Sequence, residues 1–287
     1  MVESDNLSVN VTNSSDVMII DFSYYIIYRY HALLAWFKHS QTEMNDDLFM
    51  CKYNVLFVSN IKKIVKKLKV TNSNVILVGD CSRKSIWRCK LFEGYKGERD
   101  KYWENNPMNP KVFEAITDIL LPELRNDLKY QYFCMDKMEA DDIAYTIVRK
   151  LRENNTFSKS IYVVTNDNDY LQLMSDTTNI VNLPSLKSIS HRGIDNCPVK
   201  SLCHKILCGD QSDNISGLIS AKVSSNIIKD INFDQSKEGV WNDIKTKLSA
   251  TKTKCTDWQK QLELNTTLID MSCIPSEYQD KINVFVS

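Results

Sequence analysis

Nine acidic side chains stand at positions where they could share one site. Four apolar segments with the character of buried strands end in an acid or reach one soon afterwards, and a polar loop adds two more. The nine acids are Asp21, Asp80, Glu139, Asp141, Asp142, Asp167, Asp169, Asp210 and Asp213. Carboxylates that are brought together repel one another unless divalent cations neutralise them. Because an all-oxygen ligand set suits Mg²⁺ or Mn²⁺, the pattern predicts a divalent-metal centre.

Each group of acids also has a simpler structural explanation. The acids at 139–142 could stabilise the first turn of a helix, those at 167–169 could cap a turn, and those at 210–213 could form a loop. Asp21 is harder to explain in this way, because it ends an apolar strand and a buried, unpaired acid is costly. Five such coincidences at one edge of a sheet are implausible, so the metal centre is the better explanation.

The elements that would position these acids alternate along the chain. Apolar runs predict strands at 17–21, 74–80, 130–134 and 160–165. Helical periodicity and a Pro start signal predict helices at 22–38, 60–69, 110–119 and 139–151. This alternation predicts an α/β fold with a mostly parallel central sheet, helices on both faces, and all strand carboxyl ends at one edge. After about residue 185 we expect only helices and loops, which gives a core at 1–185 and a helical subdomain at 186–287.

Cations and aromatic rings alternate in the segment between the second and third predicted strands. They are Arg83, Lys84, Arg88, Lys90, Lys96, Arg99 and Lys101, interleaved with Trp87, Phe92, Tyr95 and Tyr102. This mixture suits an unstacked nucleic-acid strand, although a solvated loop could have the same composition. The lysines at 62–69 occupy one face of a predicted helix, and a solvated helix surface explains them more simply than contact with duplex phosphates does.

The composition is that of an ordinary globular protein. With 43% apolar and 25% charged residues among 287, the chain is not disordered, collagen-like or a coiled coil. Its 36 basic side chains balance 36 acidic ones, so no global field attracts nucleic acid or a membrane. Residues 1–16 lack the features of a signal peptide, and no apolar run is long enough for a bilayer. We therefore expect an intracellular, cytoplasmic protein with no membrane contact.

Nine cysteines are present, and no two of them form a Cys-x-x-Cys pair. Cys197, Cys203 and Cys208 lie near His191 and His204, which leaves a zinc site as an alternative, but their spacing matches no usual ligand pattern. Buried, reduced thiols are the better interpretation.

Six segments, in this order, resemble motifs of the 5′-nuclease (flap endonuclease) superfamily. They are Ile19-Ile20-Asp21, Val78-Gly79-Asp80, Tyr95-Lys96-Gly97-Glu98-Arg99, Glu139-Ala140-Asp141-Asp142-Ile143-Ala144, Thr165-Asn166-Asp167-Asn168-Asp169-Tyr170-Leu171-Gln172-Leu173 and Gly209-Asp210-Gln211-Ser212-Asp213-Asn214-Ile215. Each motif is weak alone, but the order and spacing of the set over about residues 17–230 are highly specific. The resemblance, which is strongest to phage members, implies a PIN-like core with a helical arch at about 81–110. It also implies a helix-hairpin-helix-like element in the C-terminal DNA-binding subdomain.

The same resemblance implies roles for individual residues. A first Mg²⁺ would be held by Asp21, Asp80, Glu139 and Asp141, with Asp142 beside them, and a second would be held or oriented by Asp167, Asp169, Asp210 and Asp213. Mn²⁺ would substitute for Mg²⁺. Lys96 and Arg99, on the arch, would act as catalytic cations at the scissile phosphate. Further candidate nucleic-acid contacts are Arg83, Lys84, Arg88 and Tyr95, and one of Tyr24, Tyr25 and Tyr28 could stack on a base near the cut.

One segment departs from the family pattern. After the sixth motif the family usually continues with a glycine-rich hairpin that binds the duplex backbone, often with K⁺, but Ser220 and Lys222 stand here where glycine is expected. Lys222 could replace the backbone contacts with a side-chain cation. The tail at 280–287 also lacks a Gln-x-x-aromatic sliding-clamp peptide.

The implied activity is two-metal hydrolysis of phosphodiesters by a structure-specific 5′ nuclease in DNA replication or repair. Such an enzyme would act as a 5′-3′ exonuclease, as a flap endonuclease and, like an RNase H, in the removal of RNA primers. Its substrates would be DNA with 5′ flaps or nicks and RNA–DNA hybrids. We expect a monomer, with a single-stranded-DNA-binding protein or a sliding clamp as candidate partners.

Two other functions fit part of the pattern. A haloacid-dehalogenase-type phosphatase needs Asp-x-Asp at the first strand, whereas the sequence has Asp21-Phe22-Ser23. A non-catalytic nucleic-acid-binding relative would not need the full set of carboxylates, all of which are present. The nuclease is the stronger hypothesis.

Overall fold

The computed structural model of the chain describes residues 7–189, 195 and 197–287, apart from the side chains of residues 100 and 101. These residues form two compact units. The sheet unit contains residues 7–86, 103–189 and 276–287, and the helical unit contains residues 87–102 and the described residues between 195 and 275. The chain passes between the units more than once, so neither unit is one continuous segment.

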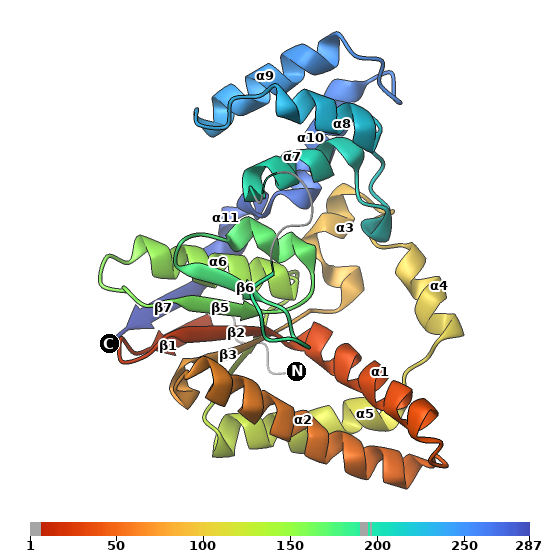
Figure 1. Cartoon of the computed structure of the whole chain (residues 1–287), viewed down its shortest axis with the longest axis vertical. Helices are drawn as coiled ribbons and strands as arrows, with labels where there is room; N and C mark the ends of the chain where they lie inside the picture. Colours follow the sequence, from red (N-terminus) through yellow and green to blue (C-terminus); the bar gives the residue numbers. More distant parts are fainter. Residues whose placement is uncertain (1–6, 190–194, 196) are drawn as a thin grey trace. The chain divides into compact units, whose positions relative to one another are not determined.

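A five-stranded, entirely parallel sheet forms the centre of the sheet unit (Figure 1). Its strand order is β4 (Gln131–Cys134), β3 (Val75–Gly79), β2 (Val17–Asp21), β5 (Ile161–Val164) and β6 (Thr178–Val181). The structure confirms the four predicted strands to within one residue at each end. It adds β6, which has only four residues and is positioned by its pairing with β5. All residues of β2 and β3 are buried, as expected for strands covered on both faces.

Helices cover both faces of this sheet. Figure 1 shows α1 (Phe22–Ser40), α2 (Asp46–Leu68) and α5 (Pro110–Ala115) on one side and α6 (Ala140–Glu153) on the other. On the first side, Met18 and Ile20 of β2 join Phe57 of α2 and Val112 of α5 in one apolar cluster. The sheet is therefore fixed between two layers, and its carboxyl edge is held in a defined position.

Two predicted helices differ from the observed ones in length. The helix predicted at 60–69 is the end of α2, which begins at Asp46 because Asn45 caps it and accepts a hydrogen bond from the Leu48 amide. Its first half is rich in aromatic residues and packs against α1, a tertiary contact that the lysine pattern does not reveal. The helix predicted from Pro110 starts there, but continues as the π-helical turns η3 (Ile116–Leu120) and η4 (Glu123–Asp127).

A second, two-stranded sheet corrects the expectation that no strand follows residue 185. β7 (Ile282–Val286) pairs in parallel with β1 (Leu7–Val11), with Leu7 opposite Ile282. Both strands alternate in burial, but each is short and is stabilised by a partner about 275 positions away. β7 also packs on α6, and α11 (Ser276–Gln279) precedes it.

The helical unit contains α3 (Trp87–Leu91), the start of α4 (Glu98–Asn105), α7 (Pro198–Cys208), α8 (Ala221–Lys229), α9 (Lys237–Ser249) and α10 (Trp258–Ile269). Both α8 and α10 pack against α7. Short 3₁₀ turns complete the chain at Asn72–Asn74 (η1), Arg83–Ser85 (η2), Asn168–Leu173 (η5), Gln211–Asp213 (η6) and Met271–Cys273 (η7). Among the described residues, no helix combines the length and the apolar character that crossing a membrane requires.

A tight hairpin joins α7 to α8 and depends on two glycines. Asp210 and Ile215 exchange backbone hydrogen bonds of 2.9 and 2.7 Å, which closes the hairpin. Gly209 has φ of +75°, and a Cβ atom on Gly217 would lie 1.9 Å from the Cys208 carbonyl oxygen. Ser220 then caps α8, because its hydroxyl accepts a hydrogen bond from the Val223 amide at 3.4 Å. Ser220 thus has a structural role as the residue that starts α8.

Candidate metal centre

Asp21 is the last residue of β2 and the N-cap of α1. Its carboxylate accepts a hydrogen bond from the Tyr24 amide at 3.0 Å and another from the Thr165 hydroxyl at 3.4 Å. The residue is only 7% exposed. Burial raises the pKa of Asp21 to about 7, and the negative charges of Asp80 and Asp167 add to the increase. This is the electrostatic environment that a bound cation would stabilise.

Asp80 follows β3 and connects the sheet edge to the start of α6. Its carboxylate accepts a hydrogen bond of 2.8 Å from the Ala140 amide, and its own amide donates to the Ser23 hydroxyl at 2.9 Å. Since Asp21 pairs with Val78 in the register of β2 and β3, Asp80 lies two residues beyond Asp21 along the same edge. The parallel strands therefore bring these two acids together, as the sequence predicted.

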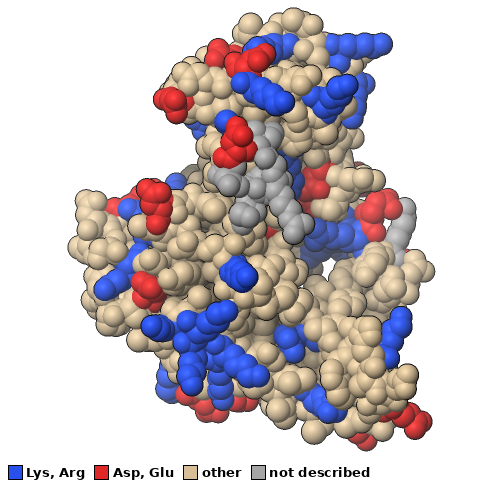
Figure 2. All heavy atoms as spheres, in the orientation of Figure 1, with Lys and Arg blue, Asp and Glu red and all other residues tan. Residues whose placement is uncertain are grey.

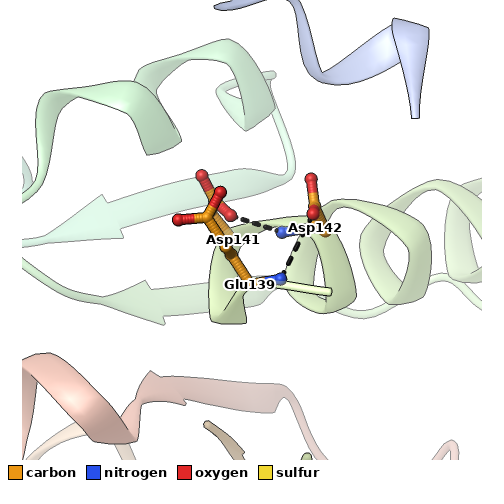
Figure 3. A group of neighbouring side chains, drawn as sticks. All are labelled: Glu139, Asp141 and Asp142. Carbon is orange, nitrogen blue, oxygen red and sulfur yellow. Dashed lines mark hydrogen bonds between the residues drawn. The ribbon is translucent and has the colours of Figure 1, made fainter. Parts of the chain in front are cut away.

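The start of α6 carries three acids, and one carboxylate oxygen from each lies within 4.8 Å of those of the other two. Figure 3 shows the carboxylates of Glu139 and Asp141 side by side, with Asp142 on the other side of the helix start. The buried Asp142 accepts a hydrogen bond from the Glu139 amide at 3.2 Å, so it also caps the helix. The amide of Asp142 donates to Asp141 at 2.8 Å. The acids at the start of α6 can therefore both cap the helix and bind a metal ion.

Asp167 and Asp169 follow β5 at the same edge of the sheet. Asp167 caps η5 and accepts a hydrogen bond of 2.9 Å from the Asp169 amide, so the turn that these acids were expected to cap is a 3₁₀ turn. Tyr170, in the same turn, is 1% exposed. Its pKa lies well above the ordinary value because it is buried and because the charges of Asp21, Asp141, Asp80 and Asp167 all act on its hydroxyl. Acids from four separate segments therefore lie close enough to act electrostatically on one buried side chain.

Sequence reasoning missed Tyr170 as part of this site. Tyr170 belongs to the fifth motif, but nothing in the neighbouring sequence indicates whether a tyrosine after Asp169 lies in the core or in the site. Of the three candidate stacking tyrosines, Tyr25 is buried and its hydroxyl donates to the Phe57 carbonyl at 2.7 Å. Tyr24 and Tyr28 are partly exposed and stack on each other, with ring centroids 6.2 Å apart. The candidates for base stacking are therefore reduced to this pair.

Asp210 and Asp213 belong to the helical unit, where both lie beside cations. Asp210 caps η6 and forms an ion pair of 2.7 Å with Lys205. Burial alone would raise the pKa of Asp210, but Lys205 outweighs this effect and the net pKa is lowered. The buried Asp213 forms an ion pair of 2.8 Å with Arg99, and the Lys96 ammonium lies 3.8 Å from its other oxygen.

The candidate nucleic-acid contacts differ in exposure. Lys84 and Lys222 are exposed and Arg83 is partly exposed, so these side chains can reach a ligand. Arg88 is 2% exposed and its Nε donates to the Leu268 carbonyl at 2.9 Å. Tyr95 is 4% exposed, and its hydroxyl lies 3.3 Å from Asp213. Because the side chains of Arg88 and Tyr95 are buried and form hydrogen bonds inside the helical unit, we do not propose them as nucleic-acid contacts.

The cysteines of the helical unit show the environment of buried thiols. Burial raises the pKa of Cys203 to about 12, and none of the nine cysteines, all of which lie among the described residues, forms a disulfide. The ring of His204 contacts Cys208 at 3.6 Å and Ser224 at 2.9 Å. No group of three Cys or His ligands occurs among the residues that the structure describes, and His191 lies outside them.

The fold and the site together define an α/β protein whose parallel sheet gathers acids from four segments at its carboxyl edge, a donor set that suits divalent cations. A family model described as the 5′-3′ exonuclease, N-terminal resolvase-like domain, matches residues 16–200. The chain belongs to this 5′-3′ exonuclease family, which confirms the predicted superfamily.

Curated relatives and solved structures agree with this assignment. The chain is 24% identical to a 5′-3′ exonuclease of Buchnera aphidicola over 72% of this chain and 67% of that protein. It is 27% identical to the ribonuclease H of Enterobacteria phage T4 over 59% of this chain and 54% of that protein, about half the length of the phage enzyme.

The fold is similar to that of the phage T5 D15 protein, co-crystallized with metal ions. The TM-score is 0.60 at 20% identity, and the similarity covers 93% of this chain and 96% of that one. A structure of the T5 D15 flap endonuclease with DNA and metal ions gives a TM-score of 0.59, also at 20% identity. These likenesses confirm the predicted PIN-like fold.

Proposed function

We propose that the chain is a structure-specific 5′ nuclease that hydrolyses phosphodiester bonds with two divalent cations, Mg²⁺ or Mn²⁺. The observation that carries the proposal is the convergence of Asp21, Asp80, Asp141 and Asp167 on one buried position, with a raised pKa at Asp21. The donor set is all oxygen, which fits Mg²⁺ and Mn²⁺. The metal-bound and DNA-bound T5 structures support the same reading.

In this proposal the residues of the site have different roles. The acids at the sheet edge would hold the first cation, and Asp169, Asp210 and Asp213 would hold or orient the second together with Asp167. When bound, the cations would activate a water molecule and stabilise the leaving oxygen. Hydrogen bonds from Tyr24, Ala140 and Asp169 amides fix three of the carboxylates before substrate arrives. Lys96 and Arg99 would neutralise charge on the scissile phosphate.

The proposed substrates are DNA with 5′ flaps or nicks and RNA–DNA hybrids, handled in DNA replication or repair in the cytoplasm. We propose that the protein acts as a monomer. A single-stranded-DNA-binding protein or a sliding clamp is the candidate partner, and co-elution with either would identify it.

The deciding experiment uses three substrates labelled at the 5′ end: a flap, a nicked duplex and an RNA–DNA hybrid. Each is incubated with the purified protein and Mg²⁺, Mn²⁺ or EDTA. Metal-dependent cleavage near the 5′ end supports the proposal, and the relative rates rank the substrates. Binding without cleavage under every metal condition would instead indicate a non-catalytic relative. Release of phosphate from a small phosphate ester without cleavage of DNA would indicate a phosphatase.

A further inference from the structure

The sheet unit contains a polar pocket outside the carboxylate site. It has a volume of about 170 Å³ and lies between α1, α2 and the segment that follows β6. Tyr28 and Arg29 contribute from α1, Asn60 and Lys63 from α2, and Leu183 and Pro184 from the segment after β6. The pocket therefore combines two cations, an amide and an aromatic ring on an apolar floor.

Charge is strongly segregated around this pocket, although the whole chain is neutral. No acid occurs between Asp21 and Glu43, between Asp47 and Asp80, or between Asp176 and Asp195. Those stretches supply every element that lines the pocket. The exposed cations around it are Lys62, Lys63, Lys66, Lys67 and Lys187. Figure 2 shows Lys and Arg side chains gathered on this face around the C-terminal half of α2.

Two contacts involve lysine side chains of this surface, and the surface keeps a net positive charge. Lys62 pairs with Glu123 at 3.5 Å, which uses one cation at the edge. Lys67 donates to the Ser185 carbonyl at 3.4 Å and so ties α2 to the segment after β6. The remaining cations face solvent or the pocket, and their mutual repulsion would be relieved by an anion.

Arg29 gives the pocket an unused donor. Its Nε is buried and has no hydrogen-bond partner among the described residues, while its guanidinium lies 5.7 Å from the centre of the Tyr28 ring. A buried N–H group without a hydrogen-bond acceptor destabilises the protein. A guanidinium forms its strongest hydrogen bonds with an anion such as phosphate. The stacked Tyr28 ring limits the directions in which the guanidinium can turn.

A short series of contacts connects the pocket to the acids at the sheet edge. Tyr24, whose amide binds Asp21, stacks on Tyr28, and its hydroxyl accepts a hydrogen bond from Asn166 at 2.9 Å. Asn166 precedes Asp167 and accepts a hydrogen bond from the Leu183 amide at 3.0 Å. Arg29 follows Asp21 by eight residues on α1, roughly 12 Å along the helix axis. One nucleic-acid strand can therefore reach both places.

We propose that this pocket binds a backbone phosphate of the same nucleic acid that is cut at the carboxylate site. Arg29 and Lys63 contact that phosphate directly, and the exposed Lys66 and Lys67 contact neighbouring phosphates. This inference rests on the proposed function. A nucleic acid fits better than an acidic peptide, because the pocket lies beside the acids proposed to cut phosphodiesters and a peptide would have no reason to be held there.

The test measures binding and cleavage of a 5′-flap DNA by Arg29→Met, Lys63→Met and the double variant. Lys281→Met is the matched control, since Lys281 is exposed elsewhere in the sheet unit. Binding is measured in EDTA from about 50 to 200 mM salt. We expect each single variant to lower the slope of log affinity against log salt by about one, and the double variant by about two. KM should rise, while kcat at saturating DNA stays within about twofold of wild type.

A second arm identifies the phosphate chemically. Neutral methylphosphonate linkages are placed one at a time in the flap DNA on both sides of the cut. At one linkage the wild type should lose affinity, whereas Lys63→Met should not, because the contact is already absent. A 5′-phosphate and a 5′-hydroxyl flap are compared to distinguish a terminal from an internal phosphate. Lys63 is exposed, so this variant remains informative even if Arg29→Met does not fold.

The outcomes separate this inference from the proposed function. If wild type cleaves normally but the Lys63 and Arg29 variants keep its affinity and salt slope, the pocket is not a nucleic-acid site. Binding of an acidic peptide that is lost in Lys63→Met, with DNA binding unchanged, would likewise overturn it in favour of a protein partner. Absence of cleavage by wild type would contradict the proposed function, while the binding measurements would still decide the role of the pocket.

Discussion

Arg99 and Asp213 form an ion pair within the helical unit, with Nη2 of Arg99 lying 2.8 Å from Oδ1 of Asp213. The Asp213 side chain is only 8% exposed, whereas that of Arg99 is 44% exposed. The carboxylate is thus fixed and partly shielded from water, and it holds a cation whose other side faces solvent. The Lys96 amide also donates to the Asp213 carbonyl at 3.0 Å. Asp213 therefore positions both cations of the third motif.

This relationship predicts that the two residues act as a unit. Arg99→Ala should slow the single-turnover rate by about 10²–10³, as expected for the loss of one donor to a charged transition state. Asp213→Asn should also slow it, and the double variant should be little worse than the slower single variant. Lys260→Ala, an exposed cation of the same unit, is the control. A rate for Arg99→Ala within threefold of wild type would disprove the catalytic role.

Substitution of the carboxylates at the sheet edge should impair cleavage of DNA but not its binding. Asp80→Asn and Asp167→Asn should each lower the cleavage rate by about 10³ or more, since several kcal/mol of charge stabilisation is lost with the metal site. DNA affinity in EDTA should be unchanged or higher, because a negative charge is removed near phosphates. Quench-flow cleavage and fluorescence anisotropy measure the two effects. Asp257→Asn, in the helical unit, should change neither, and full activity in both test variants would refute the site.

Asp21 should make the metal-free protein sensitive to pH. Its pKa is raised from 3.8 to about 7 in the folded protein, first by burial and then by neighbouring acids. The folded state therefore binds more protons than the unfolded state between these values, and stability falls as pH rises through this window. The loss is on the order of a few kcal/mol. We expect the Tm in EDTA to decrease from pH 4.5 to 7.5 in wild type and to change less in Asp21→Asn.

Mg²⁺ should reverse that trend. A cation beside Asp21 favours its charged form, so added Mg²⁺ should raise the Tm more at pH 7.5 than at pH 5. Calorimetry with Mg²⁺ and with equal ionic strength of NaCl distinguishes binding from screening. An identical increase with both salts would show that no specific site is present.

Lys222 lies exposed in the first turn of α8, which Ser220 caps. If its ammonium contacts duplex phosphate, Lys222→Ala should lower the salt slope of duplex binding by about one, with the cleavage position unchanged. Ser220→Ala should lower stability by about 1 kcal/mol through loss of the cap, and Ser220→Gly by only a few tenths. Comparing K⁺ with Na⁺ tests the backbone: a marked K⁺ preference would mean that the hairpin still binds through its amides.

Gly217 should be essential to the hairpin between α7 and α8. In Gly217→Ala the new Cβ would lie 1.9 Å from the Cys208 carbonyl oxygen, so the backbone must move, at a cost of about 1–3 kcal/mol or more. Gly239→Ala, in α9, is the matched control, since the new Cβ would meet only side-chain atoms of Gln235, which precedes the helix. That change should be neutral or stabilising by up to about 1 kcal/mol. Urea unfolding of both variants checks the difference, and equal midpoints would contradict the close approach of Gly217 to Cys208.

The sequence alone determined four of the five strands of the central sheet and the acids that follow them. Strands such as 17–21 are continuous apolar runs because both faces are covered, and an acid that ends such a run has no ordinary place in a core. Parallel topology then brings Asp21 and Asp80 to one edge without any need to know the packing of side chains. The pattern of apolar residues and the parallel direction of the strands were sufficient for this placement.

Only the tertiary structure decided which side chains are exposed enough to contact a nucleic acid and where distant segments of the chain meet. Arg88 and Tyr95 have the composition of nucleic-acid contacts, yet Leu268 and Asp213, more than 110 positions away, bind them inside the helical unit. β1 and β7 form a sheet from opposite ends of the chain. The pocket at Arg29 arises from three separated segments. Such features depend on contacts between residues far apart in sequence, whose energies no local pattern of residue types contains.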